Sequence, residues 1–229
     1  MTRFLCLSMF IFSCAGQSKV ASPPLGSDNE AAVEKKSVEA TPVQSLVRLA
    51  GSIEIVTIKN ETAPVPLQIQ SFEASLLGVE SADGVFEFED AALVLPLAAI
   101  NSGLDIRDQR IRETFFHADQ NPNARFEIAR LILDSPTVPT SAKFEGKLVI
   151  GAFSQALIGS FVAAEPVEGA EQPRDGAVNL VSAEPMVVSI DALGMGERLK
   201  ALIELCGHQS VADTVQVSAK GTFSVTPSN

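Results

Sequence analysis

Residues 101–128 read NSGLDIRDQRIRETFFHADQNPNARFEI and form the densest cluster of Arg, Asp and Phe in the chain. Within this stretch, residues 106–113 favour a helix, and Asp105 is placed to cap it. A turn at residues 121–123 then leads to residues 125–128, which alternate between polar and apolar side chains like a strand. A strand, a short helix and a return strand predict a plug at one end of a barrel.

The rest of the folded chain is predicted to form strands. Alternating or continuous apolar segments occupy residues 46–50, 52–58, 67–74, 85–89, 92–100, 126–133, 143–150, 155–162, 178–190 and 213–225. Pro64 and Pro66 are expected to break the chain before residue 67. Residues 194–206 place apolar side chains near helical spacing and predict a second helix close to the C-terminus.

This order of elements favours an all-β fold with short helices. There is no alternation of strand and helix typical of a parallel sheet, and no internal repeat. We therefore predict an antiparallel lipocalin-like β-barrel of about eight strands, with one helix inserted after a mid-chain strand and another near the C-terminus. A barrel is favoured over a sandwich because closure removes the edges that long alternating strands would expose.

Composition limits the classes of partner. The 229 residues include 13 Phe but no Trp or Tyr, so the aromatic rings carry no polar group and belong in an apolar interior or around an apolar cavity. The net charge of −11 argues against binding to nucleic acid and against electrostatic binding to anionic lipid head groups. Solubility alone is sufficient reason for such a charge.

The N-terminus has the pattern of an export signal. Residues 1–13 contain one positive charge, Arg3, and an apolar run that is too short to span a bilayer as a helix. Ile11-Phe12-Ser13-Cys14 resembles the lipobox of bacterial lipoproteins, in which the Cys is lipidated. A plain secretory signal or an uncleaved tail is the alternative. Lipidation of Cys14 would place the protein in the periplasm or at the outer membrane.

The next segment is expected to be a tether. Residues 14–45 are rich in Ser, Pro, Glu, Lys and Ala and contain few large apolar residues, so they cannot bury enough surface to fold. Residues 46–229 then form a single predicted barrel domain.

The opening stretch carries a family resemblance. Its motif residues, with the strand that follows them, are Ile100-Asn101-Ser102-Gly103, Arg107-Asp108, Ile111-Arg112, Phe115-Phe116, Pro122, Phe126 and the segment Gly146-Lys147-Leu148-Val149-Ile150-Gly151. This pattern resembles the YceI-like family of bacterial periplasmic, lipocalin-like proteins. The family often carries an Arg-x-x-Phe-Gly motif near its end, whereas the matching residues 189–195 here lack both the Arg and the Phe.

The resemblance implies a long barrel whose apolar interior holds a polyisoprenoid chain, such as the tail of an isoprenoid quinone or a polyprenyl lipid. The residues expected to line this interior are Phe72, Phe86, Phe88, Phe115, Phe116, Phe126 and Phe144. A barrel packed solid, serving as a structural or protein-interaction module of the envelope, would show the same alternation of apolar residues.

The charged motif residues have two interpretations. Arg107, Asp108 and Arg112 could bind an anionic head group, or they could tie the short helix to strand ends and loop carbonyls, which is the commoner use of such a cluster. Asn101 and Pro122 complete the motif and are interpreted as structural.

The sequence does not predict an enzyme. Cys206-Gly207-His208 brings a thiol near an imidazole, but there is no nucleophile elbow, no His pair at metal-ligand spacing and no phosphate-binding Gly loop. We therefore expect no catalytic residues and no metal. The expected partners are an apolar lipid and, through Cys14, a membrane; a homodimer is left open.

Overall fold

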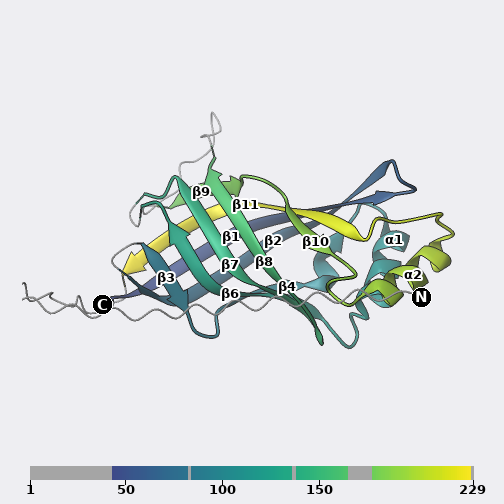
Figure 1. Ribbon diagram of the computed structural model, residues 1–229, viewed down its shortest axis with the longest axis horizontal. Helices are drawn as coiled ribbons and strands as arrows, with labels where there is room; N and C mark the ends of the chain where they lie inside the picture. Colours follow the sequence, from purple (N-terminus) through teal and green to yellow (C-terminus); the bar gives the residue numbers. More distant parts are fainter. Residues whose placement is uncertain (1–42, 82–83, 136–137, 165–176, 228–229) are drawn as a thin grey trace, which may run out of the picture. The chain divides into compact units, whose positions relative to one another are not determined.

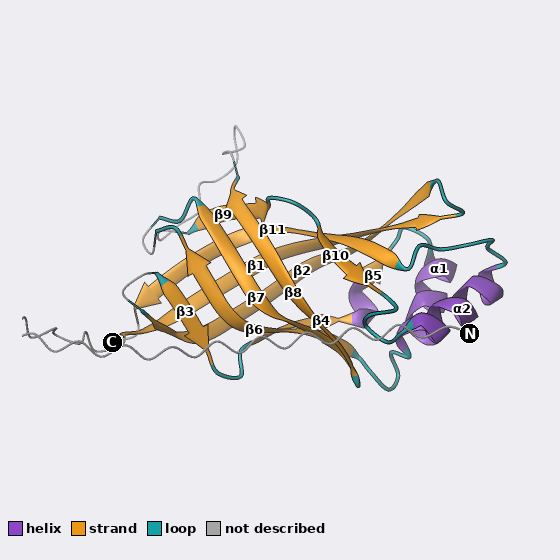
Figure 2. Ribbon diagram, viewed as in Figure 1, coloured by secondary structure: helices purple, strands orange, loops and turns teal. Residues whose placement is uncertain are grey.

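The computed structural model describes residues 43–81, 84–135, 138–164 and 177–227, which form a β-barrel with helices at one end (Figures 1 and 2). The strands are β1 (Val43–Lys59), β2 (Ala63–Glu80), β3 (Val85–Phe88), β4 (Ala92–Pro96), β5 (Ile100–Asn101), β6 (Asn123–Leu133), β7 (Ser141–Ile150), β8 (Phe153–Ala163), β9 (Val178–Ser182), β10 (Met186–Ser189) and β11 (Thr214–Pro227). The helical segments are η1 (Leu97–Ala99), α1 (Asp105–Arg110), η2 (Ile111–Phe116) and α2 (Gly196–Cys206). The expected signal, Cys14 and the tether up to residue 42 lie outside the described residues.

The barrel closes through β1, which pairs with β2 along one edge and with β11 along the other. All these strand pairs are antiparallel, and the 11 strands occupy eight positions around the barrel. Three short strands, β3, β4 and β5, share the position between β2 and β6, and β9 and β10 share the position beside β11. The predicted antiparallel barrel of about eight strands is therefore confirmed.

Two glycines allow β1 and β11 to approach each other closely. Gly51 of β1 lies opposite Gly221 of β11. A Cβ atom on Gly51 would lie 2.2 Å from the carbonyl oxygen of Lys220, and one on Gly221 would lie 2.1 Å from that of Ala50. The pairing of β1 with β2 also shifts register between Gly51 and Ile53. Such an irregularity bends a strand, as barrel closure requires.

Strand β2 is longer than the sequence indicates. Pro64 and Pro66 do not break it but pair opposite Ile58 and Val56 of β1. The second edge of β2 pairs with β5 at Gln68 and Ile69 and with β3 at residues 78–80, so it has no described strand partner beside the two prolines. Proline is tolerated along such an unpaired edge.

Three further sequence boundaries differ from the structure. β1 is a single strand that begins at Val43, slightly before residue 46. The expected strand 92–100 ends at Pro96, where the chain enters η1. The expected strand 178–190 is divided into β9 and β10, with Pro185 in the break.

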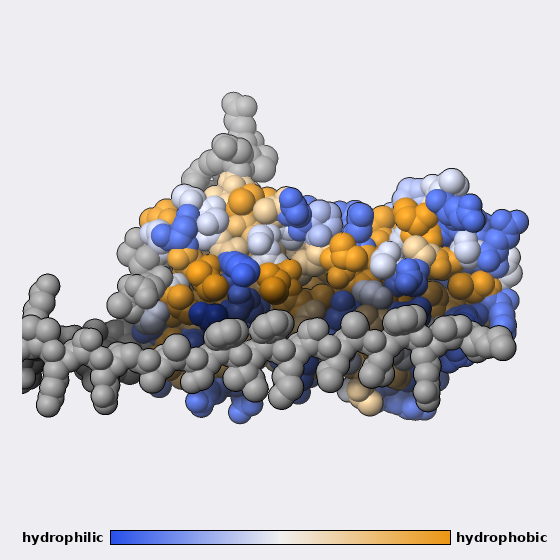
Figure 3. Space-filling model, viewed as in Figure 1, coloured by the Kyte–Doolittle hydropathy of each residue, from blue (hydrophilic) through white to orange (hydrophobic). Residues whose placement is uncertain are grey.

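The interior divides into two apolar clusters. One contains Phe86, Leu131 and Phe223, which are almost fully buried. The other includes Phe115 of η2 and Leu199 of α2, so the helices close that end of the barrel (Figure 2). The outer face mixes polar and apolar side chains (Figure 3). None of the helices among the described residues has both the length and the apolar character needed to cross a bilayer.

We expect Gly51→Ala to lower the free energy of unfolding by about 1–3 kcal/mol, because the added methyl group would collide with the backbone of β11. Urea unfolding measures the change. Ser71→Ala on the exposed face of β2 is the control and should leave stability nearly unchanged. Equal stability of Gly51→Ala and the native protein would contradict the close approach of β1 and β11.

Candidate functional site

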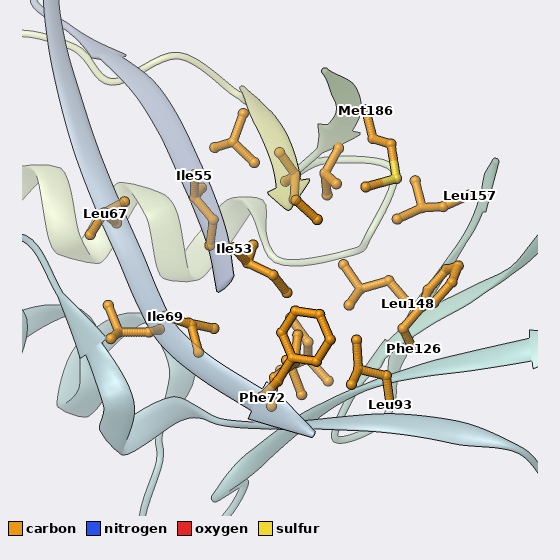
Figure 4. A pocket seen from close by; sticks show the side chains of 18 of the residues that line it. Ile53, Ile55, Leu67, Ile69, Phe72, Leu93, Phe126, Leu148, Leu157 and Met186 are labelled. Carbon is orange, nitrogen blue, oxygen red and sulfur yellow. The ribbon is translucent and has the colours of Figure 1, made fainter. Parts of the chain in front are cut away.

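The barrel contains a cavity of about 260 Å³. Figure 4 shows side chains pointing into it from strands on several sides of the barrel: Ile53, Ile55, Leu67, Ile69, Phe72, Leu93, Phe126, Leu148, Leu157 and Met186. The volume exceeds that of an engineered apolar cavity of about 150 Å³ that stays dry and binds benzene. The space is therefore too large to be a minor packing defect.

The cavity is long and almost entirely apolar. Leu49 and Thr57 of β1 both line it, which corresponds to about 26 Å of strand and about 20 Å along the axis of a tilted barrel. Among the described lining residues, Thr57, Lys220 and Thr222 carry polar side chains, and the last two are exposed. Such a lining favours an elongated apolar ligand and disfavours an unpaired charge.

Five of the seven Phe residues expected around the interior line the cavity: Phe72, Phe115, Phe116, Phe126 and Phe144. Phe86 and Phe88 do not. Phe86 is fully buried in the cluster that fills the far end of the barrel, and the ring of Phe88 lies over Gly78. Alternation places both rings on the inner face of β3 but does not reveal their height along the barrel. Phe161 and Phe223 also line the cavity and were missed for the same reason.

Phe115 and Phe116 form the aromatic part of the helical end of the cavity. Their rings meet edge to face, with centroids 4.8 Å apart and planes inclined by 76°. Phe115 is buried, and both side chains line the cavity from η2. This pair therefore joins the helical cap to the interior.

The charged motif residues Arg107 and Asp108 bind Ser102, in the segment that leads into α1. Asp108 is buried, and its carboxylate accepts hydrogen bonds from the backbone N–H of Ser102 at 2.9 Å and from the Ser102 hydroxyl. The Arg107 Nε and Nη2 atoms donate to the hydroxyl and carbonyl oxygens of Ser102, each at 2.8 Å. Asp105 does not cap the helix: it is the first helical residue, and Leu104 occupies the capping position.

The remaining motif residues also contact the backbone. The Asn101 side chain accepts a hydrogen bond from the N–H of Gly103 at 2.7 Å, and Arg112 Nη1 lies 3.5 Å from the carbonyl oxygen of Ile100. The Pro122 carbonyl oxygen accepts from the N–H of Leu97 at 2.9 Å. The described contacts of these residues thus fix the loops around α1.

Arg198 of α2 holds the two helical segments together. Its Nη1 atom lies 3.4 Å from the carbonyl oxygen of Phe115 and 3.1 Å from that of Phe116, so it donates to carbonyls at the end of η2. Its guanidinium carbon lies 4.8 Å from the centre of the Phe153 ring. No sequence pattern indicates this role, because the acceptors are backbone groups 82 and 83 residues away along the chain.

Residues 189–195, which depart from the family motif, also help to form the helical end of the cavity. Met195 is fully buried, and Leu193 is buried and lines the cavity. Apolar side chains therefore occupy this region instead of the Arg and Phe of the motif.

Cys206 is the last residue of α2, and His208 follows two positions later. The Cys206 thiol is partly buried, and Arg110 Nη1 lies 3.8 Å from its sulfur. Burial lowers the pKa of His208 below its ordinary value, and the positive charges of Lys59, Arg110 and Arg107 lower it further. The imidazole is therefore neutral at neutral pH. The described residues contain no cluster of three or more metal-ligating side chains.

The closed barrel, the helical cap and the long apolar cavity define a lipocalin-like β-barrel with an internal ligand-sized space. Residues 57–223 match the YceI-like domain, and the chain belongs to this family. The family resemblance of the opening stretch is thereby confirmed.

Solved structures show the same fold. A polyisoprenoid binding domain from Saccharophagus degradans, implicated in plant cell wall breakdown, has a TM-score of 0.57 and 14% sequence identity, covering 79% of this chain and 98% of its own. BcnA from Burkholderia cenocepacia has a TM-score of 0.51 and 15% identity, covering 76% of this chain and 96% of its own. A comparison with curated proteins gave no match.

We expect Asp108→Ala to lower the free energy of unfolding by about 1–3 kcal/mol, because it leaves the backbone N–H and the hydroxyl group of Ser102 without their buried acceptor. Urea unfolding measures this loss. Asp105→Ala, three residues away and exposed, is the matched control and should change stability by less than about 1 kcal/mol. If both variants lost the same stability, the Asp108 network would not hold the cap.

Proposed function

We propose that this barrel binds a polyisoprenoid-type lipid, such as an isoprenoid quinone or a polyprenyl lipid, and carries or buffers it without catalysis. The observation that supports this most directly is the long apolar cavity inside the barrel. The family supports a binding role, and the similarity to the polyisoprenoid binding domain from Saccharophagus degradans supports the class of ligand.

The shape and lining of the cavity suit such a lipid. A polyisoprenoid is slender, flexible and apolar, and it can follow a space about 20 Å long. Transfer of apolar surface from water into the cavity contributes about 25 cal/mol for each Å² buried on both partners. Branched side chains such as Ile53, Ile55 and Leu148 provide contacts for the methyl branches of the ligand.

The alternative is a barrel packed solid that serves as a structural or protein-interaction module. The cluster around Phe86 and Leu131 fits this alternative at one end of the barrel. The cavity does not, because a packed interior leaves few voids larger than a water molecule. The binding function is therefore favoured.

The proposed setting is the bacterial cell envelope, with Cys14 as a lipid anchor. The support comes from residues 1–13 as an export signal and from the lipobox-like residues that end at Cys14. Lipid supply and lipid binding would then occur in the same compartment.

The proposed function predicts that a co-purifying apolar lipid can be extracted from the full-length chain. Organic extraction followed by mass spectrometry identifies it, and uptake of an added short-chain quinone measures binding. We expect Leu157→Trp to weaken quinone binding at least about tenfold, because the larger side chain fills the cavity.

The matched control is Ile158→Trp at the next position of β8. Ile158 is 59% exposed on the outer face, so this variant should bind quinone like the native protein. Absence of both extracted lipid and quinone uptake would refute the proposed function. So would equal quinone binding by the Leu157→Trp and native proteins, provided that thermal unfolding shows both to be folded.

The proposed anchor predicts that Cys14→Ala releases the protein from the membrane. Fractionation of cells that express the full-length chain should find the native protein with membranes and the variant in the soluble fraction, because a lipidated Cys is required for attachment. Cys206→Ala is the control and should leave the distribution unchanged. A Cys14→Ala variant that remained with the membrane would exclude the anchor.

A further inference from the structure

The cavity ends at one level along the barrel. On β7 its lining reaches Phe144 but not Ala142, the next residue on the same face of the strand, although both are buried. On β1 the lining reaches Leu49 but not Val47, which is fully buried. On β11 it ends at Phe223, which lies opposite Leu49. Strands on different sides of the barrel therefore stop lining the cavity at the same layer.

Three Phe side chains form this layer. The rings of Phe144 on β7 and Phe161 on β8 meet edge to face, with centroids 5.0 Å apart and planes inclined by 84°. Phe223 contributes from β11. All three side chains line the cavity and also pack in the apolar cluster at the far end of the barrel. These three residues, which we call the aromatic floor, therefore separate the cavity from the packed interior.

A glycine makes room for one of these rings. Gly159 is buried on β8, two residues before Phe161 and opposite Phe144 of β7. A Cβ atom on Gly159 would lie 3.0 Å from the Cε2 atom of the Phe161 ring. The Phe161 ring thus occupies space that a side chain at residue 159 would need, and there it meets the Phe144 ring.

The barrel is packed behind the aromatic floor. Phe86 and Leu131 lie opposite each other in the pairing of β3 with β6, and both are fully buried. Leu131 also lies opposite Phe144 in the pairing of β6 with β7. A ligand in the cavity could extend past this layer only by displacing close-packed side chains, which would destabilise the fold.

We propose that the aromatic floor sets the length of the isoprenoid chain that the barrel accepts, with the end of the chain resting on the rings of Phe144 and Phe161. This inference rests on the proposed function. The floor is then a specificity determinant that selects among isoprenoids by their number of units.

The lining also gives the direction of the ligand. The side chains beside the floor, Leu49, Ile128 and Leu180, are as apolar as the floor itself. A polar head group placed there would lose its hydrogen bonds to water and gain none in return. The head group therefore lies toward the helical end, and each added isoprene unit moves it further from the floor until the chain fills the cavity.

A competition among prenols tests the floor. Geraniol, farnesol, geranylgeraniol, geranylfarnesol and solanesol share one hydroxyl head group and increase in length. The full-length protein is incubated with an equimolar mixture in mild detergent and recovered, and the bound prenols are extracted and quantified by mass spectrometry. For the native protein we expect the bound amount to increase with length and to stop increasing at the prenol that fills the cavity, because each methylene group transferred from water contributes about a factor of four in affinity.

The variants are Phe161→Ala and Phe144→Ala, which remove one ring of the floor. Each leaves room for about one further isoprene unit. Relative to the native protein, each should raise the amount of the next longer prenol bound, divided by that of the prenol the native protein prefers, at least about tenfold. Phe161→Leu removes less volume and should raise this ratio about threefold, so it carries the test if thermal unfolding shows that an Ala variant is not folded.

The matched control is Phe86→Ala, the same change behind the floor. Phe86 is fully buried and does not line the cavity, whereas Phe161 is partly exposed. Phe86→Ala should therefore destabilise the fold at least as much as Phe161→Ala while leaving the preferred prenol unchanged. This control separates a change in length selection from a general loosening of the barrel.

The outcomes distinguish the floor from the proposed function. If the native protein and the folded floor variants bound prenols with the same length preference, the floor would be overturned and the binding function would stand. Preference of the native protein for solanesol, or an equal shift in Phe86→Ala, would overturn the floor in the same way. If no prenol bound to the native protein, the floor and the proposed function would both fail.

Discussion

The pairing of β1 along both of its edges is the interaction on which the structure depends. β1 is bonded to β2 on one side and to β11, the last strand of the chain, on the other. This contact depends on Gly51 and Gly221, since a side chain at either position would meet backbone at 2.2 Å or less. Without it the sheet would remain open and its interior would be exposed to water.

Closure also fixes the division of the interior. At one end, large rings and aliphatic side chains around Phe86 and Leu131 fill the barrel. At the other, the helical cap replaces them, and the space between becomes the cavity. The cap is itself stabilised by polar contacts to backbone, from Asp108 to Ser102 and from Arg198 to the end of η2. Hydrogen bonds outside the cavity thus hold in place the apolar side chains that surround it.

The sequence alone was sufficient to predict the barrel, to predict both helices and to identify the family. Alternation of polar and apolar residues, as in β7, indicates which side chains face inward, and this depends only on local geometry. The alternation could not distinguish Phe86, in the packed end of the barrel, from Phe126, beside the cavity. The position of a residue along the barrel axis depends on strand register, which alternation does not specify. Nor could alternation reveal the role of Arg198, which comes from contacts with residues distant in the sequence.

The cavity also affects the stability of the protein. Side chains around an empty space lose dispersion contacts, so the unoccupied barrel is less stable than a packed one of the same length. Any ligand that fills the space stabilises the folded state by mass action, and the gain increases with the concentration of free ligand. The unoccupied molecules spend more time unfolded and are open to proteolysis. Through its cavity, the protein therefore couples its own lifetime to the supply of what it binds.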